Sequence, residues 1–216
     1  MGFSLPLVYP ILDSSFLPVT GRAEFLDRLG SSLADAGARL MEYRNKTGTD
    51  AEVLADAQVL RAAMPAVALV MDDRVDVALA ARFDGVHVDS GDLPVDEARR
   101  LLVMDRSRRE SIVGTSASTE AQLAEALASG ADYIALGPVY PTTTKQTSVP
   151  PIGIEGVRRF RELAGPAPVL VAAAGITLQT APGVLEAGAS AVAVSAAIFR
   201  HIDPAAEFRR WIVALG

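Results

Sequence analysis

The chain repeats one local pattern four times: a stretch with helical periodicity ends in small residues or glycine, and a short apolar run follows. The junctions are Ala36–Ala38, Phe83–Gly85, Gly130–Asp132 and Gly188–Ser190. Glycine after a helix suits the left-handed position that ends it. Short apolar runs between turns are typical of strands buried on both faces of a parallel sheet. The pattern therefore predicts helices that alternate with buried parallel strands.

The spacing of these junctions indicates how many strands the chain holds. Successive junctions lie 46 to 58 residues apart, roughly twice what one strand and its crossover helix need. One further apolar run lies inside each interval, and another precedes the first junction. The eight expected strands are Leu7–Leu12, Arg39–Tyr43, Val67–Val70, Val86–Val88, Ser111–Gly114, Tyr133–Leu136, Pro168–Ala172 and Ala191–Val194.

Amphipathic stretches separate these strands. The expected helices are Arg22–Ala36, Glu52–Met64, Val75–Arg82, Val95–Leu102, Glu120–Ser129, Ile154–Ala164, Thr180–Ala187 and Ala205–Ala214. Eight strands alternating with eight helices, without a break in composition, predict α/β architecture: one single-domain (β/α)₈ TIM barrel over residues 1–216. A doubly wound open sheet is the alternative, but no glycine-rich dinucleotide fingerprint follows the first strand.

The composition excludes several classes of site and partner. The chain has no cysteine, which rules out disulfides, thiolate nucleophiles and cysteine-ligated metals. Its net charge is −6, so we expect no broad electropositive surface for nucleic acid. No apolar run reaches the roughly 18 residues of a membrane span, and Met1–Leu12 is interpreted as a strand rather than a signal peptide. We expect a cytoplasmic protein; its oligomeric state, a homo-oligomer included, stays open.

Polar residues at the ends of the expected strands are the candidates for chemistry, because the active site of such a barrel lies there. Glu42, Arg44 and Lys46 alternate around the end of the second strand, so they share one face. They direct one acid and two cations toward the barrel mouth. A charged strand end that faces water is the alternative.

Carboxylates follow the third and fourth strands. Asp72 and Asp73 come after the third strand, and Asp89 and Asp92 after the fourth. Neighbouring carboxylates suit Mg²⁺, which prefers oxygen ligands and keeps waters for a phosphate-bearing substrate. Asp72 has the alternative role of helix N-cap. His87 lies inside an apolar run and is interpreted as a core histidine.

Hydroxyls and glycine follow the remaining strands. Ser116 comes after the fifth strand, in a stretch that also suits helix capping. The long loop after the sixth strand holds Thr142–Lys145, three hydroxyls and a cation that suit an oxyanion; a plain surface loop is the alternative. After the seventh and eighth strands, Gly175 and Ser195–Ala196 suit phosphate binding by backbone N–H groups. Together these residues predict a substrate with two phosphate-bearing ends, one of them bridged by a metal.

Two other reaction classes lack their residues. A hydrolytic Ser–His–Asp site is disfavoured because no histidine stands at an expected strand end, and hydride transfer lacks its cofactor motif. The charged segment Arg106–Glu110 is interpreted as a solvated turn on the far face of the barrel.

Four stretches resemble the thiamine phosphate synthase (thiamine-phosphate pyrophosphorylase) family. They are YRNK at Tyr43–Lys46, the span from Asp72 to Pro94, GADYIALGPVYPTTTK at Gly130–Lys145, and the span from Ala174 to Val194. The GPVYPTTTK loop is the most specific of them, and the resemblance runs from about Leu7 to Phe199. It implies a Mg²⁺-dependent (β/α)₈-barrel transferase of thiamine biosynthesis. Such an enzyme joins 4-amino-2-methyl-5-hydroxymethylpyrimidine diphosphate to a thiazole phosphate and releases pyrophosphate.

The resemblance also implies roles for individual residues. It assigns catalytic roles to Arg44, Lys46, Ser116 and Lys145, Mg²⁺ binding to Asp73 and Asp92, and substrate binding to Glu42, Asp72, Thr142, Thr144, Gly175, Val194, Ser195 and Ala196. The three cations are expected to bind pyrophosphate, with the serine Ser116 beside the pyrimidine. The two threonines, Gly175 and the loop after the eighth strand are expected to bind the thiazole phosphate.

The chain departs from the family pattern inside this site. This chain has Glu42 where the family usually has glutamine, Asp72 where it has asparagine, and Asp89–Ser90 where it has glycine–glutamine. It also has Ser118 in place of histidine, Ala174 in place of glycine, and Ala196 in place of a phosphate-binding serine. Two alternatives stay open. A thiazole tautomerase-like paralogue carries histidine at the position of Pro138, and the proline here argues against it. A non-catalytic binder of thiamine precursors is favoured by the acidic departures.

Overall fold

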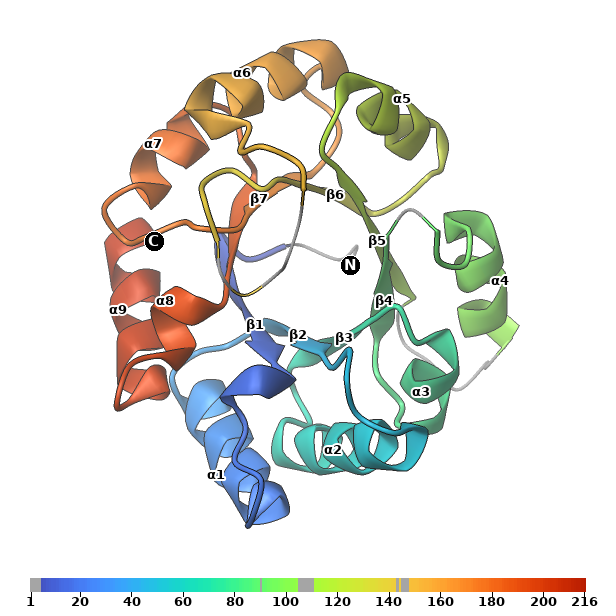
Figure 1. The fold of residues 1–216 in the computed structure, drawn as a ribbon, viewed down its shortest axis with the longest axis vertical. Helices are drawn as coiled ribbons and strands as arrows, with labels where there is room; N and C mark the ends of the chain where they lie inside the picture. The colour runs from blue at the N-terminus through green and yellow to red at the C-terminus, as the bar shows by residue number, and fades with distance from the viewer. Residues whose placement is uncertain (1–4, 90, 105–110, 143, 145–147) are drawn as a thin grey trace.

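Eight parallel strands close into a barrel that helices surround (Figure 1). The computed structural model describes residues 5–89, 91–104, 111–142, 144 and 148–216. The strands pair in chain order, and the last closes the ring against the first. This topology confirms the TIM barrel and excludes the doubly wound sheet. The predicted turn Arg106–Glu110 lies outside the described residues.

Five of the strands end one to three residues later than the apolar runs that predicted them, and the other three end where predicted. They are β1 (Val8–Asp13), β2 (Leu40–Arg44), β3 (Ala68–Asp72), β4 (Gly85–Val88), β5 (Ile112–Ala117), β6 (Tyr133–Leu136), β7 (Leu170–Ala173) and β8 (Ala191–Val194). Arg44, Asp72 and Ser116 are strand residues, so their prediction as residues after the strands was wrong. The reason is that an apolar run ends before its strand does where the inward positions line a cavity.

Helices cover the outside of the barrel. They are α1 (Arg22–Asp35), α2 (Asp50–Ala63), α3 (Val75–Ala80), α4 (Val95–Met104), α5 (Glu120–Ala128), α6 (Gly153–Ala164), α7 (Ala181–Glu186), α8 (Ala196–Phe199) and α9 (Pro204–Leu215). The short helix α8 and a 3₁₀ turn, η1 (Ser14–Phe16), are additional to the predicted helices.

Side-chain caps fix where several helices begin. The Thr119 side chain accepts a hydrogen bond from the backbone N–H of Gln122 and starts α5, and Asp203 caps α9 in the same way. The alternative role of Asp72 as a helix N-cap is wrong, because α3 begins after Arg74 and has no side-chain cap. Asp72 is therefore available to the barrel interior.

Apolar side chains pack in two layers. The outer layer lies between helices and strands and includes Leu33, Leu60 and Trp211. The inner layer fills the barrel near the first residues of the strands; its buried members are Tyr9, Leu40, Val70, Ile112, Tyr133, Val171, Ala191 and Ala193. The rings of its two tyrosines meet edge to face at 6.4 Å. This layer fills the barrel at that end, and the cavity lies above it, toward the carboxyl ends of the strands.

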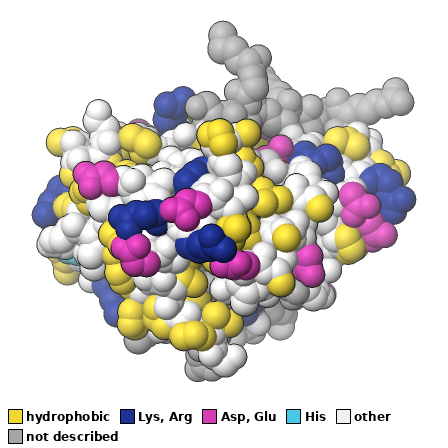
Figure 2. All heavy atoms as spheres, turned by 90° about the horizontal axis from the view of Figure 1, so that it is seen from above, with side chains coloured by type: hydrophobic (Ala, Val, Ile, Leu, Met, Phe, Trp, Pro, Cys, Tyr) yellow, Lys and Arg dark blue, Asp and Glu magenta, His cyan; other side chains and the backbone are white. Residues whose placement is uncertain are grey.

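Charges of both signs are interspersed on the face that carries α5 and α6 (Figure 2). Arg159 of α6 forms an ion pair with Glu120 of α5 at 3.0 Å, and Arg158 pairs with Glu155 within α6. Such exposed pairs contribute little to stability. Across the described ranges, no helix is both long enough and apolar enough to cross a membrane.

Candidate active site

The inward side chains of β2, β3 and β5 change from apolar to polar along the strand, whereas those of β7 and β8 stay apolar. Every second residue of a barrel strand faces inward. In β2 this series is Leu40, Glu42 and Arg44, and in β3 it is Val70 and Asp72; the first member of each belongs to the inner apolar layer. The polar members line a cavity above that layer. The inward-facing positions of the strands therefore supply both the inner apolar layer and the polar residues of the cavity.

The cavity has a volume of about 490 Å³, a size typical of small-molecule sites. Ten of the residues predicted for the site lie in its wall: Glu42, Arg44, Asp72, Ser116, Thr142, Thr144, Gly175, Val194, Ser195 and Ala196. They come from six stretches that are far apart in the sequence. The structure thus brings them together, and their individual roles stay predictions.

Glu42 supplies a buried carboxyl group to the cavity wall. Only 4% of the residue is exposed, and its carboxyl accepts no hydrogen bond within the part of the chain that the structure describes. Burial raises the pKa of Glu42 to about 7; His87 and Arg44 oppose this rise, while Asp72 and Asp89 add to it. The group therefore changes charge near neutral pH.

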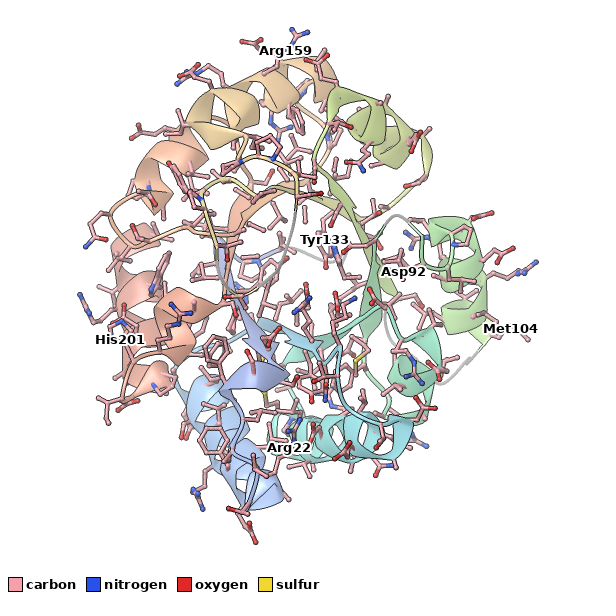
Figure 3. The ribbon with its side chains drawn as sticks, in the orientation of Figure 1. Arg22, Asp92, Met104, Tyr133, Arg159 and His201 are labelled. Atoms are coloured by element: carbon pink, nitrogen blue, oxygen red, sulfur yellow. The ribbon has the colours of Figure 1, made fainter. Side chains whose placement is uncertain are left out.

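His87 is a cavity residue as well as a satisfied buried one. Its Nε2 lies 2.8 Å from Ser116 Oγ, and its Nδ1 lies 3.1 Å from the hydroxyl of Tyr133, which stands inside the barrel (Figure 3). Burial lowers the pKa of His87, but Asp89 and Glu42 outweigh burial and raise it above the ordinary value. The prediction that no histidine stands at a strand end was wrong, because His87 is the penultimate residue of β4.

Two cations meet one carboxylate beside the cavity. Arg44 donates a hydrogen bond to Asp13, and its Nε lies 3.6 Å from Asp72 Oδ2. The ammonium group of Lys46 lies 2.9 Å from the same oxygen and also contacts Asp73. Lys46 is outside the cavity wall itself and reaches it through Asp72. Because both cations contact the buried carboxylate of Asp72, this carboxylate fixes the direction in which Arg44 and Lys46 point.

The predicted Mg²⁺ ligands follow neighbouring strands. Asp73 comes directly after β3, and its Oδ1 is buried without a hydrogen-bond partner in the described part of the chain. Asp92 lies in the loop after β4, where its Oδ2 accepts a hydrogen bond from the Asp89 N–H at 2.9 Å. Neither residue lines the cavity wall, and the described residues contain no cluster of three or more His, Cys, Asp or Glu suited to a metal. An unpaired buried carboxylate oxygen is nevertheless the kind of ligand that Mg²⁺ takes.

The opposite wall offers hydroxyls and backbone. Thr142 and Thr144 come from the loop after β6, Gly175 from the loop after β7, and Ser195 from the start of α8. Ser195 is the N-cap residue of α8, but its side chain makes no capping hydrogen bond, and its buried Oγ has no partner among the residues that the structure describes. These groups are suited to a phosphate. Lys145, which was predicted in the same loop, lies outside the described residues.

The loop after β6 packs closely against Gly175 in the loop after β7. Ala174 and Gly175 both have left-handed φ angles, 72° and 68°, which accounts for glycine at the first position in the family pattern. A Cβ at Gly175 would lie 2.6 Å from the carbonyl oxygen of Pro141 and 2.7 Å from Cβ of Tyr140. The loop that carries both threonines therefore rests directly on the backbone of Gly175.

Gly175→Ala should displace that loop. We expect a loss of about 1–3 kcal/mol of stability from overpacking and backbone strain. We also expect the affinity of this wall for inorganic phosphate to fall. Urea unfolding and calorimetry measure the two effects. Gly130→Ala is the control, because it has a left-handed φ of 75° but open space around its Cβ; equal losses of ligand affinity in both variants would contradict the prediction.

Tyr9, His87 and Arg200 are among the wall residues that were not predicted for the site. Tyr9 and His87 each lie on the inward series of a strand, so strict counting by two from neighbouring inward residues would have found them. Arg200 follows α8 and also reaches the wall. No local pattern distinguishes it from other surface arginines.

The fold and the cavity define a TIM barrel with a small-molecule site at the carboxyl ends of its strands. One wall carries acids and cations, and the other carries hydroxyls and backbone amides. This combination is characteristic of barrels that handle phosphate-bearing substrates.

Comparisons with known proteins identify the family. A sequence profile described as thiamine monophosphate synthase matches residues 8–198. The chain is 36% identical to thiamine-phosphate synthase of Koribacter versatilis over 94% of this chain and 92% of that one. It is 38% identical to the enzyme of the same name from Chloroflexus aurantiacus, over 81% and 78% of the two chains. The chain belongs to the thiamine monophosphate synthase family.

Solved structures agree with this placement. Thiamine phosphate pyrophosphorylase from Pyrococcus furiosus superposes with a TM-score of 0.78 at 29% identity, covering 97% of this chain and 96% of that one. A 3-hexulose-6-phosphate synthase superposes with a TM-score of 0.70 at 20% identity over 98% and 100% of the two chains. The second likeness reflects the barrel fold alone.

Proposed function

We propose that this protein is a thiamine-phosphate synthase, a transferase that joins 4-amino-2-methyl-5-hydroxymethylpyrimidine diphosphate to a thiazole phosphate. Family membership supports the reaction class. The observation that carries the proposal is the convergence of Arg44 and Lys46 on Asp72 at one wall, opposite the hydroxyls of Thr142 and Thr144. Such a site has places for two separate phosphate groups.

The reaction exchanges one bond to the pyrimidine methylene carbon for another. The bond from this carbon to the diphosphate oxygen breaks, and the diphosphate leaves with the electron pair. The thiazole nitrogen then gives its lone pair to the same carbon, so a C–N bond forms and pyrophosphate is released. Negative charge grows on the leaving group, where Arg44 and Lys46 stabilise it. No protein nucleophile takes part, which fits a chain without cysteine.

The second substrate is proposed to bind at the wall of hydroxyls. Thr142, Thr144 and Ser195, with the backbone around Gly175, offer donors to its phosphate. Glu42 and Ser116 face the space between the two walls, where the pyrimidine ring is proposed to lie. A buried carboxyl is suited to accept hydrogen bonds from an exocyclic amino group.

Asp73 and Asp92 are proposed to hold Mg²⁺. The unpaired buried oxygen of Asp73 supports this assignment. When bound, Mg²⁺ would neutralise charge on the diphosphate as a Lewis acid. Lys46, which contacts Asp73, would hold the same diphosphate from the protein side.

The direct test incubates the protein with both substrates and Mg²⁺ and measures thiamine phosphate and pyrophosphate. Equal amounts of both products are expected. Tight binding of both substrates without product would instead identify a non-catalytic binder of thiamine precursors. Isomerisation of the thiazole phosphate alone would identify a tautomerase-like paralogue.

Asp73→Asn and Asp92→Asn should each raise the Mg²⁺ concentration needed for half-maximal rate by at least about tenfold, because each removes a charged oxygen ligand. Asp96→Asn, on the exposed first turn of α4, is the control and should leave the requirement unchanged. Titration of the rate with MgCl₂ measures the shift. An unchanged requirement in both site variants would refute the metal assignment.

The cytoplasmic location and the homo-oligomer stay predictions. Cell fractionation tests the first, and sedimentation equilibrium tests the second.

A further inference from the structure

A buried polar network lies outside the cavity, between α1, α2 and the end of β2. Arg22, at the start of α1, donates to both oxygens of Asp56 in α2, at 2.8 Å from Nε and 2.6 Å from Nη2. Arg22 stands where these two helices meet (Figure 3). Tyr43 of β2 donates its hydroxyl hydrogen to the same carboxylate. Asp56 and Tyr43 are 5% and 0% exposed, so the carboxylate and the hydroxyl are shielded from water, whereas the Arg22 side chain is 30% exposed.

The network continues from β2 into the loop that follows it. Asn45 Nδ2 donates to the hydroxyl of Tyr43 at 3.1 Å. The side-chain oxygen of Asn45 accepts from the backbone N–H of Gly48 at 2.9 Å and from that of Thr47 at 3.3 Å. A Cβ at Gly48 would lie 2.7 Å from Asn45 Nδ2. The turn is therefore closed tightly around the side chain of Asn45.

Lys46 lies inside this closed turn. Asn45 precedes it, and the backbone groups that Asn45 binds follow it. The far end of the loop is also fixed, because Thr49 and Glu52 form a capping box at the start of α2. The Lys46 ammonium group projects from the turn to Asp72 Oδ2 at 2.9 Å.

The alternation along β2 links this network to the site. Glu42 and Arg44 line the cavity, so the residue between them, Tyr43, points to the opposite side of the sheet. Burying a guanidinium and a carboxylate costs solvation, and such a pair often contributes little net stability. The network therefore acts mainly by fixing the geometry at the end of β2 and less by adding net stability.

We propose that Tyr43 and Asn45 are positioning residues that orient Lys46 toward the diphosphate of the substrate, with Asp56 and Arg22 as their anchor. The inference rests on the proposed function in one respect, the binding of a diphosphate by Lys46. The residues that it adds lie on the opposite side of the sheet from the cavity and are not part of the cavity wall. A structural role alone would stabilise the loop without affecting how well Lys46 binds an anion.

A double-mutant cycle tests the inference through binding of inorganic pyrophosphate, measured by calorimetry with MgCl₂ present. Tyr43→Phe and Asn45→Ala should each weaken binding about tenfold, because small misplacements of a binding group are costly. In a Lys46→Ala background, neither change should weaken binding further. The control is Arg61→Ala, which breaks a network to Asp84 and Val67 near the start of β3; it should lower the melting temperature without changing pyrophosphate affinity.

Three results would overturn the inference. They are an equal loss in the wild-type and Lys46→Ala backgrounds, no loss from Tyr43→Phe and Asn45→Ala, and unchanged binding in Lys46→Ala itself. Because Asn45 is at the loop and only partly buried, its variant keeps the test available if Tyr43→Phe does not fold. Pyrophosphate binding requires no turnover, so the expected cycle together with absent synthase activity would support the positioning role while rejecting the proposed reaction.

Discussion

Arg44→Ala is expected to lower kcat/KM for the pyrimidine diphosphate by at least about a hundredfold. The guanidinium group stands at the cavity wall between Asp13 and Asp72, whose side chains are only 7% and 5% exposed. Its loss removes a preorganised positive charge from the place where the leaving group gains negative charge. Removal of one such group typically costs a factor of about 10²–10³ in rate.

The type of cation matters as well as its charge. Arg44→Lys keeps the charge but loses the planar fork that reaches both acids, so we expect an intermediate loss of about tenfold. Arg159→Ala, on the outer face of α6, changes the net charge equally and should leave the rate unchanged. Steady-state kinetics with each substrate varied in turn measures these effects. A folded Arg44→Ala variant within threefold of the wild type would contradict the assignment.

The fold could be predicted from local signals, because four junctions of small residues or glycine followed by apolar runs divide the chain, and their spacing leaves room for one more strand in each interval. Gly37, Gly130 and Gly188 have the left-handed φ angles that the junction pattern required. The residues at which the strands end were predicted less well. The polar residues that complete β2, β3 and β5 face a cavity, and hydrophobicity alone places them in loops.

The site was accessible to sequence reasoning where its residues come directly after an apolar run. Arg44, Asp72 and Gly175 satisfy this condition and lie at the cavity. His87 was interpreted as core because its neighbours are apolar, although they face the outer layer while it faces inward. The link from Tyr43 to Asp56 and Arg22 joins residues far apart in the chain, and no spacing rule predicts such a contact.

Glu42→Gln is expected to stabilise the protein more at alkaline pH than at acid pH. The pKa of Glu42 rises from 4.5 to about 7 in the folded protein, chiefly because the carboxyl is buried. The folded state therefore binds this proton more tightly than the unfolded chain does. As the pH rises from about 4.5 to 7, the unfolded chain loses its proton first, and the free energy of unfolding falls.

The size of the effect follows from the same shift. It corresponds to at most about 3 kcal/mol once Glu42 is fully ionised. Glutamine has nearly the same shape and no proton to lose, so the variant should gain about 1–3 kcal/mol at pH 8 and less than about 1 kcal/mol at pH 5. The raised pKa of His87 acts in the same direction, because stability that is present below pH 6.5 is lost as His87 deprotonates. That part should persist in the variant, but it should be smaller because Glu42 is one of its causes.

Urea unfolding at pH 5 and pH 8 measures the difference. Glu207→Gln is the matched control: Glu207 is also buried, but it forms an ion pair with Arg210 at 2.6 Å. Removing the charge there breaks a formed pair, so we expect no gain in stability at either pH. If Glu42→Gln and the wild type lost the same stability between pH 5 and pH 8, the carboxyl of Glu42 would already be ionised at acid pH. The cavity would then hold a permanent negative charge at the place where the pyrimidine ring is proposed to lie.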